Sequence, residues 1–195
     1  IWTLQALERA ARNGKDAREA CRQALELRPS MAAVRSAALR AWEGLRADDR
    51  DRLPELAEER RTGPLRAAEQ AARQLAGGAR VVTLSRSFSV LCTLYEAREH
   101  ITKLTVAESR PACEGRTVAE TAAGMGLDVE LVTDAAACTA VRRADAVLLG
   151  ADSLTGDAEA VNKTGSVALC AAARQFGTKA VVVATASKVL PAGVD

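Results

Sequence analysis

The spacing of apolar residues differs between the first and the second part of the chain. Up to about Leu75, apolar positions recur at the three- and four-residue spacing of helices, as in Ala17, Cys21 and Ala24. After Gly78, short apolar runs rich in β-branched residues alternate with helical segments. This change of spacing predicts one domain of helices followed by one domain of alternating strands and helices.

The first part of the chain is predicted to be helical only. Pro29 interrupts the helical pattern, and a new helix is expected from Met31 to about Leu45. Gly63–Pro64 predicts a helix break, and Gly77–Gly78 predicts the end of the last helix in this part. Residues 1–77 are therefore predicted to form an N-terminal helical domain.

The second part is predicted to be an α/β domain. Its strands are expected at Arg80–Leu84, Lys103–Ala107, Val129–Thr133, Ala146–Leu149 and Ala180–Ala184, and its helices at Val90–Glu99, Val118–Ala123, Ala135–Ala144 and Ser166–Phe176. The alternation indicates right-handed βαβ crossovers and a parallel sheet. Because the strand runs are continuously apolar, we expect them to be covered on both faces. Residues 78–195 are thus predicted to form a doubly wound, Rossmann-like sheet with helices on both faces.

Composition narrows the functional classes. The chain has 195 residues with a formal net charge of +2, which argues against direct nucleic-acid binding. No apolar run reaches the roughly 18–20 residues of a membrane-spanning helix, so no membrane contact is expected. The five cysteines form no CxxC pair, and His100 is the one histidine. We therefore expect free thiols, a cytoplasmic location and no metal site.

Polar residues follow all five predicted strands. The carboxyl ends of parallel strands meet at one edge of a sheet, where open α/β sheets bind their ligands. The segments at this edge are Ser85–Arg86–Ser87, Glu108–Ser109–Arg110–Pro111, Thr133–Asp134, Gly150–Ala151–Asp152 and Ser187–Lys188. Each carries a hydroxyl or a charge, which is more polarity than turns alone require.

Several cations accompany one carboxylate in this set. Arg110 and Arg116 flank a loop that contains Pro and Gly, and Asn162–Lys163–Thr164–Gly165–Ser166 opens a helix whose free N–H groups favour an anion. Asp152 follows the predicted strand Ala146–Leu149, with Gly150 and Ala151 in between. Such a set suits a phosphorylated polyol, because cations bind phosphate and aspartate binds hydroxyls.

Each of these residues also has a structural interpretation. Asp152 could brace its turn, the two arginines could be solvated surface side chains, and Ser85 and Ser87 could be helix caps. Lys163 could be an ordinary first-turn lysine, although the helix dipole disfavours a cation at that end.

Nucleotide-binding motifs do not match. Gly124–Met125–Gly126 lacks the third glycine of a dinucleotide fingerprint and follows a helix rather than a strand. Asn162–Lys163–Thr164 resembles the end of a phosphate loop, but Asn162 replaces the glycine before the lysine. We expect no cofactor.

The rim loops taken together resemble a known family. The motifs are, in chain order, Glu108–Ser109–Arg110–Pro111 with Gly115–Arg116, Gly150–Ala151–Asp152–Ser153 with Gly156, Asn162–Lys163–Thr164–Gly165, and Lys188. They are similar to the family that unites the alpha, beta and delta subunits of translation initiation factor 2B with ribose-1,5-bisphosphate isomerase and methylthioribose-1-phosphate isomerase. Arg28–Pro29–Ser30–Met31 also looks like that family's N-terminal motif, and the resemblance runs from about Ala17 to Pro191.

The resemblance implies a site for aldose–ketose isomerisation that uses a cysteine and an aspartate. The aspartate matches Asp152, whereas the position of the cysteine is held by Ser85. A thiolate is available near neutral pH, but a serine hydroxyl needs an added base to take part in proton transfer. The family's early Arg-Gly-Ala phosphate loop is not recognisable near Arg12–Asn13–Gly14–Lys15, and the chain ends at Asp195, before the last strands of the family.

Three functions remain open. The first is an initiation factor 2B-like protein that binds a sugar phosphate or nucleotide without isomerase chemistry. The second is an isomerase acting on a ribose 1-phosphate derivative, with Asp152 as proton shuttle and Ser85 in the cysteine position. The third is an assembly subunit with a vestigial pocket. The residues expected to bind the phosphorylated ligand are Arg86, Ser87, Arg110, Arg116, Asn162, Lys163, Gly165 and Lys188. By resemblance, a homodimer or larger homo-oligomer is expected, and a role in translation would rest on the family name alone.

Overall fold

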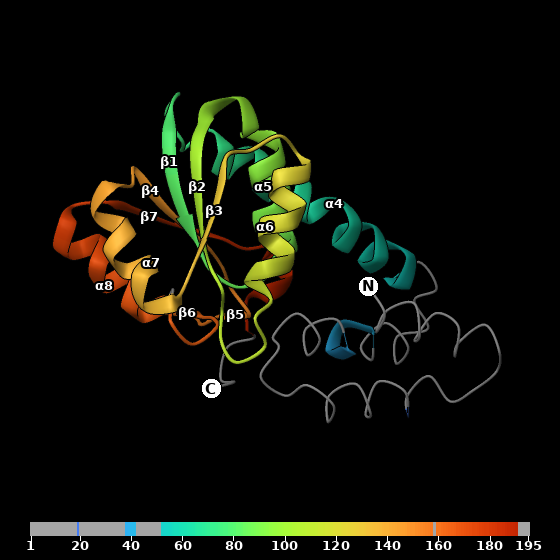
Figure 1. Ribbon diagram of the computed structural model, residues 1–195. Helices are drawn as coiled ribbons and strands as arrows, with labels where there is room; N and C mark the ends of the chain where they lie inside the picture. Colours follow the sequence, from blue (N-terminus) through green and yellow to red (C-terminus); the bar gives the residue numbers. More distant parts are fainter. Residues whose placement is uncertain (1–18, 20–37, 42–51, 158, 191–195) are drawn as a thin grey trace. The chain divides into compact units, whose positions relative to one another are not determined.

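The computed structural model describes residues 19, 38–41, 52–157 and 159–190 (Figure 1). The chain divides into two compact units: residues 1–63, 152–161 and 185–195 form one, and residues 64–151 and 162–184 form the other. We call them the first unit and the sheet unit. The predicted domain boundary between residues 77 and 78 stays a prediction.

The sheet unit contains five parallel strands in the order β3–β2–β1–β4–β7. The strands are β1 (Ala79–Thr83), β2 (Ile101–Ala107), β3 (Val129–Val132), β4 (Ala146–Gly150) and β7 (Lys179–Val183). They are connected by helices α5 (Phe88–Glu96), α6 (Gly115–Gly124), α7 (Asp134–Ala140) and α8 (Ser166–Phe176), with the short 3₁₀ helices η1 (Arg98–His100) and η2 (Val141–Arg143). The predicted parallel α/β sheet is thereby confirmed.

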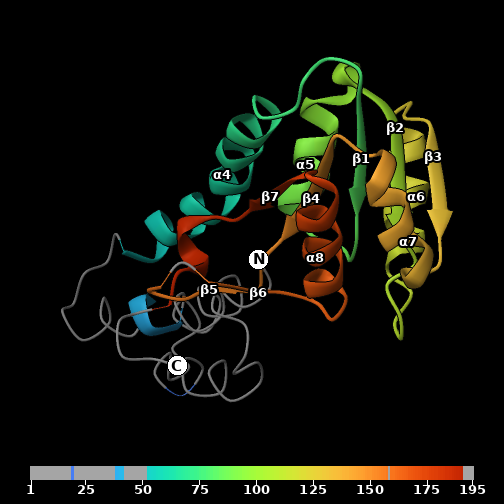
Figure 2. The same ribbon diagram turned by 90° about the vertical axis from the view of Figure 1, so that its left-hand side faces the viewer.

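Helices cover both faces of this sheet (Figures 1 and 2). Val81 packs in an apolar cluster with residues of α5 and α6, whereas the next residue, Val82, packs with residues of α7 and α8. Leu148 and Leu149 of β4 divide between the same two clusters. Successive side chains of a strand point to opposite faces, so an unbroken apolar run supplies both cores at once.

The two edge strands differ from the three central ones. Leu131 of β3 is 44% exposed and Val182 of β7 is 42% exposed, whereas β4 is buried throughout. The expectation that all five strands are covered on both faces is therefore wrong for β3 and β7. An apolar run shows that a segment suits a sheet, but it does not show whether the strand lies at the centre or at the edge.

Helix α4 (Arg52–Ala72) continues through Pro64, so the predicted break at Gly63–Pro64 is wrong. A proline inside a helix removes one backbone hydrogen bond and costs about 3 kcal/mol relative to alanine. Ala68 and Ala71 are buried one and two turns later, and Ala71 belongs to the cluster of α5 and α6. This packing stabilises the helical conformation beyond the proline.

In the first unit, β5 (Ser153–Leu154) pairs antiparallel with β6 (Ala160–Val161), and η3 (Ala186–Lys188) follows near the end of the described chain. Residues 38–41 are helical, inside the helix predicted from Met31 to Leu45. The other features predicted between residues 1 and 51, including the Arg28–Met31 motif and residues 12–15, lie outside the described residues. Within the described part of the chain, no helix has the length and apolar character needed to cross a membrane.

Candidate functional site

The loops that follow β1 and β2 are joined through Ser109. Its buried hydroxyl accepts a hydrogen bond from the Ser85 N–H (2.7 Å) and donates to the carbonyl of Ala107 (3.0 Å). The N–H groups of Ser109 and Arg110 both donate to the Asp134 carboxylate at 2.8 Å. Ser85 and Ser109 have positive φ angles of 66° and 65°, which side chains other than glycine adopt only under constraint. These hydrogen bonds supply that constraint and fix the direction of Ser85.

Two glycines allow the loops to approach closely. A Cβ atom on Gly115 would lie 1.9 Å from the carbonyl oxygen of Ala107, and one on Gly150 would lie 2.5 Å from the Cβ of Ser87. No side chain fits at either position. Ser87 occupies the N-cap position of α5, but its hydroxyl makes no capping hydrogen bond.

Glu114, which was not among the predicted site residues, connects two of them. Its Oε1 accepts hydrogen bonds from Lys163 Nζ (2.5 Å) and from Ser85 Oγ (3.2 Å). The side chains of Glu114 and Lys163 are each 22% exposed. Ser85 follows β1, Glu114 precedes α6 and Lys163 precedes α8, so one carboxylate joins three segments that are far apart in the sequence.

The Glu114 carboxylate is held in its charged form. Burial by itself would raise the pKa of Glu114, but the hydrogen bonds from Lys163 and the backbone, with the positive charge of Lys163, lower it below its ordinary value of 4.5. Glu114 is therefore a strong partner for a cation and a weak base. The sequence signal for Glu114 was a carboxylate four residues after Arg110; it was missed because Glu114 precedes a helix instead of following a strand.

The turn before α8 is also fixed. Gly165, the N-cap of α8, has a φ angle of 104°, and a Cβ there would lie 3.2 Å from Leu84 Cδ1. Asn162 donates to the Ser166 hydroxyl, which donates to the Lys163 carbonyl, both at 2.8 Å. This turn orients the N-terminus of α8, whose first N–H groups have no partner within the helix.

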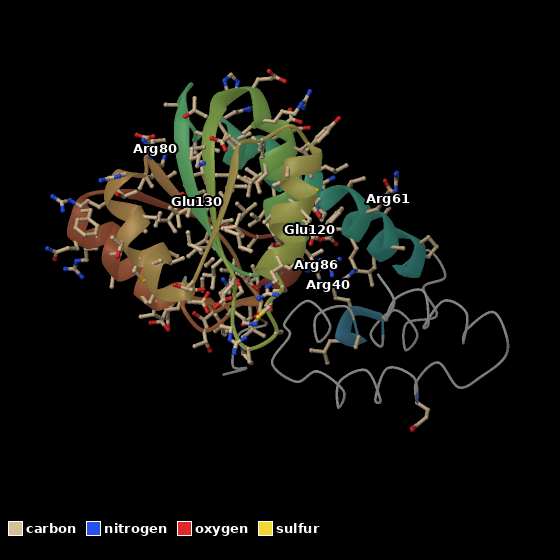
Figure 3. The ribbon with its side chains drawn as sticks, in the orientation of Figure 1. Arg40, Arg61, Arg80, Arg86, Glu120 and Glu130 are labelled. Carbon is tan, nitrogen blue, oxygen red and sulfur yellow. The ribbon has the colours of Figure 1, made fainter. Side chains whose placement is uncertain are left out.

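The predicted arginines lie at the surface of the sheet unit. Arg86 is exposed in the loop after β1 (Figure 3). Arg110 is exposed and donates to the sulfur of Cys113 at 3.4 Å, and Arg116 is 63% exposed with its Nη2 4.0 Å from Glu108 Oε2. Their guanidinium groups are open to solvent, and their part in ligand binding stays a prediction.

Asp152 and Lys188 interact within the first unit. Asp152 is half-buried, and its N–H donates to the Val161 carbonyl at 2.7 Å. Burial lowers the pKa of Lys188; the negative charge of Asp152 opposes this shift, and the positive charge of Arg60 adds to it. The structure thus brings Asp152 and Lys188 together in one unit, and Ser85 and Lys163 together through Glu114 in the other.

The sequence is similar to those of known proteins. The sequence model of the initiation factor 2 subunit family matches residues 6–193. Ribose 1,5-bisphosphate isomerase of Haloferax volcanii is 33% identical over 123 residues, which are 62% of this chain and 38% of that protein. The chain therefore spans well under half the length of this curated relative.

Two solved structures from Pyrococcus horikoshii OT3 have a similar fold. Translation initiation factor eIF-2B matches with a TM-score of 0.80 and 26% identity, over 89% of this chain and 64% of that one. The 5-methylthioribose 1-phosphate isomerase matches with a TM-score of 0.64 and 25% identity, over 72% of this chain and 43% of that one.

The close approach at Gly115 makes a first prediction. Gly115→Ala should lower the free energy of unfolding by about 3 kcal/mol, because the new methyl group overlaps a backbone carbonyl of β2. Gly124→Ala, at the other end of α6, places its methyl group in open space and should leave stability unchanged or raise it by up to about 1 kcal/mol. Urea unfolding followed by circular dichroism measures the free energy of unfolding of both variants. Equal changes in Gly115→Ala and Gly124→Ala would contradict the tight packing at Gly115.

The lowered pKa of Glu114 predicts a dependence of stability on pH. A carboxylate with a depressed pKa stabilises the folded state above its ordinary pKa and loses this contribution as the pH falls. The free energy of unfolding of wild type should exceed that of Glu114→Gln by about 1 kcal/mol at pH 6.5. This difference should shrink at pH values below 4.5. Glu120→Gln, on the exposed side of α6, is the control and should show no such trend. A difference that stays constant down to pH 3 would refute the ion pair.

Proposed function

Because this chain belongs to the initiation factor 2 subunit family, as its loop motifs predict, we propose that it binds a phosphorylated sugar or nucleotide at the C-terminal rim of the sheet, without isomerase chemistry. The observation that carries the proposal is the Glu114 carboxylate, which joins Lys163 and Ser85 beside the ends of the central strands. Open parallel sheets bind ligands in this region.

The phosphate is assigned to the segment before α8. Lys163 supplies a cation that is already oriented by Glu114, and the helix N-terminus that begins after Gly165 supplies N–H donors. Arg86, Arg110 and Arg116 are exposed cations on the neighbouring loops, and they add electrostatic attraction for an anionic ligand.

The roles predicted for Asp152 and Lys188, a hydroxyl acceptor and a second phosphate-binding cation, concern the first unit and stay separate predictions. Asp152 and Lys188 interact electrostatically within that unit. An ionised carboxylate accepts hydrogen bonds from sugar hydroxyls.

Isomerase chemistry is not expected because of the hydrogen bond that Ser85 makes to Glu114. Its hydroxyl donates to Glu114, which is the kind of contact that could activate a nucleophile or proton carrier. Lys163 stabilises the charged form of Glu114, however, and a carboxylate with a lowered pKa removes a proton from serine poorly.

An isomerase is the second candidate. The observation that favours it is the similarity to relatives named ribose 1,5-bisphosphate isomerase, one of which is 33% identical over the matched region. In that case Asp152 would shuttle the proton between neighbouring carbons of the sugar. Another group would replace the thiol of the cysteine whose position Ser85 holds.

Binding can be measured by titration calorimetry with ribose 1,5-bisphosphate, AMP and methylthioribose 1-phosphate. Lys163→Met should weaken binding of the preferred ligand by about 1.5–3 kcal/mol, roughly 10- to 150-fold in Kd, because a charge-assisted hydrogen bond is lost. Lys103→Met is the matched control: Lys103 is 31% exposed and paired with Asp128 at 3.0 Å, near the amino end of β2. It should leave affinity unchanged.

Other outcomes separate the alternatives. If wild type binds none of the three ligands but sedimentation velocity shows a stable oligomer, the chain is an assembly subunit and the binding proposal is wrong. Equal losses in both lysine variants would mean that the ligand is attracted by overall charge and has no site at Lys163.

Turnover separates binding from isomerisation. We expect no conversion of ribose 1,5-bisphosphate by wild type, and appearance of activity in Ser85→Cys if the remaining groups are in place. Conversion by wild type that disappears in Asp152→Asn would overturn the non-catalytic proposal and establish the isomerase.

A further inference from the structure

A cavity of about 700 Å³ lies over β1, β2 and β3, on the face of the sheet that α7 covers. The seven residues of α7 extend for about 10 Å, whereas the seven residues of β2 extend for about 23 Å. A helix of this length leaves part of the strands uncovered, and the cavity lies between these strands and residues of α7 and η2. All of its lining residues belong to the sheet unit.

The strands place two cations side by side in this cavity. Arg80 is paired with Lys103 in the register of β1 and β2, and neighbouring strands lie about 5 Å apart. Both side chains line the cavity. Like charges on paired positions destabilise a sheet, so this pair is unfavourable unless an anion offsets it.

Two further cations, Arg142 and Arg143 of η2, line the same cavity. We call them the η2 arginines. Glu130 of β3 also lines the cavity, which it shares with Arg80 (Figure 3), and it forms no ion pair within the described part of the chain. The lining therefore combines four cations with one carboxylate that none of them contacts.

Neighbouring carboxylates offset few of these charges. Asp128 pairs with Lys103 at 3.0 Å, while the carboxylate of Asp145 accepts the backbone N–H of Arg80 at 2.8 Å. The guanidinium groups of Arg80 and of the η2 arginines make no ion pair or hydrogen bond with any residue that the structure describes. Their charges are available to an anionic ligand.

We propose that this cavity is a second anion site, which binds two phosphate groups linked as a diphosphate. One phosphate is assigned to Arg80 and Lys103, and the other to the η2 arginines, since a guanidinium group can form two parallel hydrogen bonds with phosphate. A diphosphate has adjacent charges that match these adjacent cations. Ribose 1,5-bisphosphate, whose phosphates are at opposite ends of a pentose, matches them less well.

The cavity also has apolar surface. Val82, Val132, Ala136 and Ala140 line it beside the cations. A free diphosphate would leave this surface in contact with water, whereas the organic part of a diphosphate ester would cover it. Free pyrophosphate and a diphosphate ester thus share the chemistry that the cations bind, and the apolar surface distinguishes them.

This site is separate from the one proposed at Lys163. Arg80 and Lys103 lie in the first half of their strands, whereas Lys163 precedes α8, beyond the carboxyl end of β4. The inference therefore goes beyond the proposed function and does not depend on it. If the four cations are only solvated surface groups, they attract anions through overall charge, and every exposed arginine of the sheet unit contributes alike.

The test is titration calorimetry with inorganic pyrophosphate, inorganic phosphate and ADP, in buffer without divalent cations. Wild type should bind pyrophosphate about tenfold more tightly than phosphate, because pyrophosphate can contact both pairs of cations. Arg80→Gln and Arg142→Gln should each weaken pyrophosphate binding by about tenfold. Arg73→Gln is the matched control and should leave the affinity unchanged: it removes the same charge from an exposed arginine after α4, whose Ala71 packs on the opposite face of the sheet.

Thermal unfolding shows whether a loss of affinity comes from the site itself. Without ligand, Arg80→Gln should unfold at the temperature of wild type or above it, because the repulsion between Arg80 and Lys103 is removed. Should Arg80→Gln lose its thermal transition, Arg142→Gln, at an exposed position of η2, gives the same comparison with Arg73→Gln.

The outcomes are distinct. Tighter binding of ADP than of pyrophosphate would support a diphosphate ester as the ligand, and the reverse order would support free pyrophosphate. Binding of neither, equal losses in all three arginine variants, or a loss confined to Lys163→Met would overturn the inference. The proposed function is tested with other ligands and at Lys163, so either can fail while the other holds.

Discussion

The parallel pairing of β1 with β2 on one side and β4 on the other is the constraint on which the rest of the structure depends. Val82 is paired with Thr105 of β2 and with Val147 of β4, so three strands end at one edge. After β1 the chain enters α5 on one face, whereas α8 covers the opposite face. The change of direction beside β1 leaves room at the strand ends, where the polar loops gather.

These loops contain several unfavourable features. Ser85, Ser109 and Cys113 have positive φ angles, and Glu114 Oε2 is buried without a hydrogen-bond partner in the described part of the chain. Such features persist when surrounding contacts fix them, and they are concentrated at sites of function. Here the hydrogen bonds of Ser109 and Asp134 fix the backbone, and the close packing at Gly115 leaves it no alternative.

The ion pair between Lys163 and Glu114 sets the charge of the site that we propose for an anion. Without Glu114, Lys163 would be a cation available to any phosphate. With Glu114 beside it, the charge of Lys163 is paired. The same pair accounts for the proposed loss of chemistry, because it keeps the carboxylate that contacts Ser85 ionised and weakly basic.

Much of this could be predicted from local patterns. The apolar runs located all five strands, and helix α8 was predicted with its observed bounds at Ser166 and Phe176. The course of α4 through Pro64 was not predictable, because packing of Ala71 overrides a local preference. Glu114 was missed for a related reason: its partners, Ser85 and Lys163, are 29 and 49 residues away, and only the folded chain brings them together.

The most direct test of the account is a crystal structure of the protein with ribose 1,5-bisphosphate. We expect phosphate oxygens at hydrogen-bond distance, about 2.7–3.2 Å, from Lys163 Nζ and from N–H groups at the start of α8. Ligand bound elsewhere would contradict the account, for example in the cavity of about 700 Å³ that Arg80, Lys103 and Arg142 line over β1, β2 and β3.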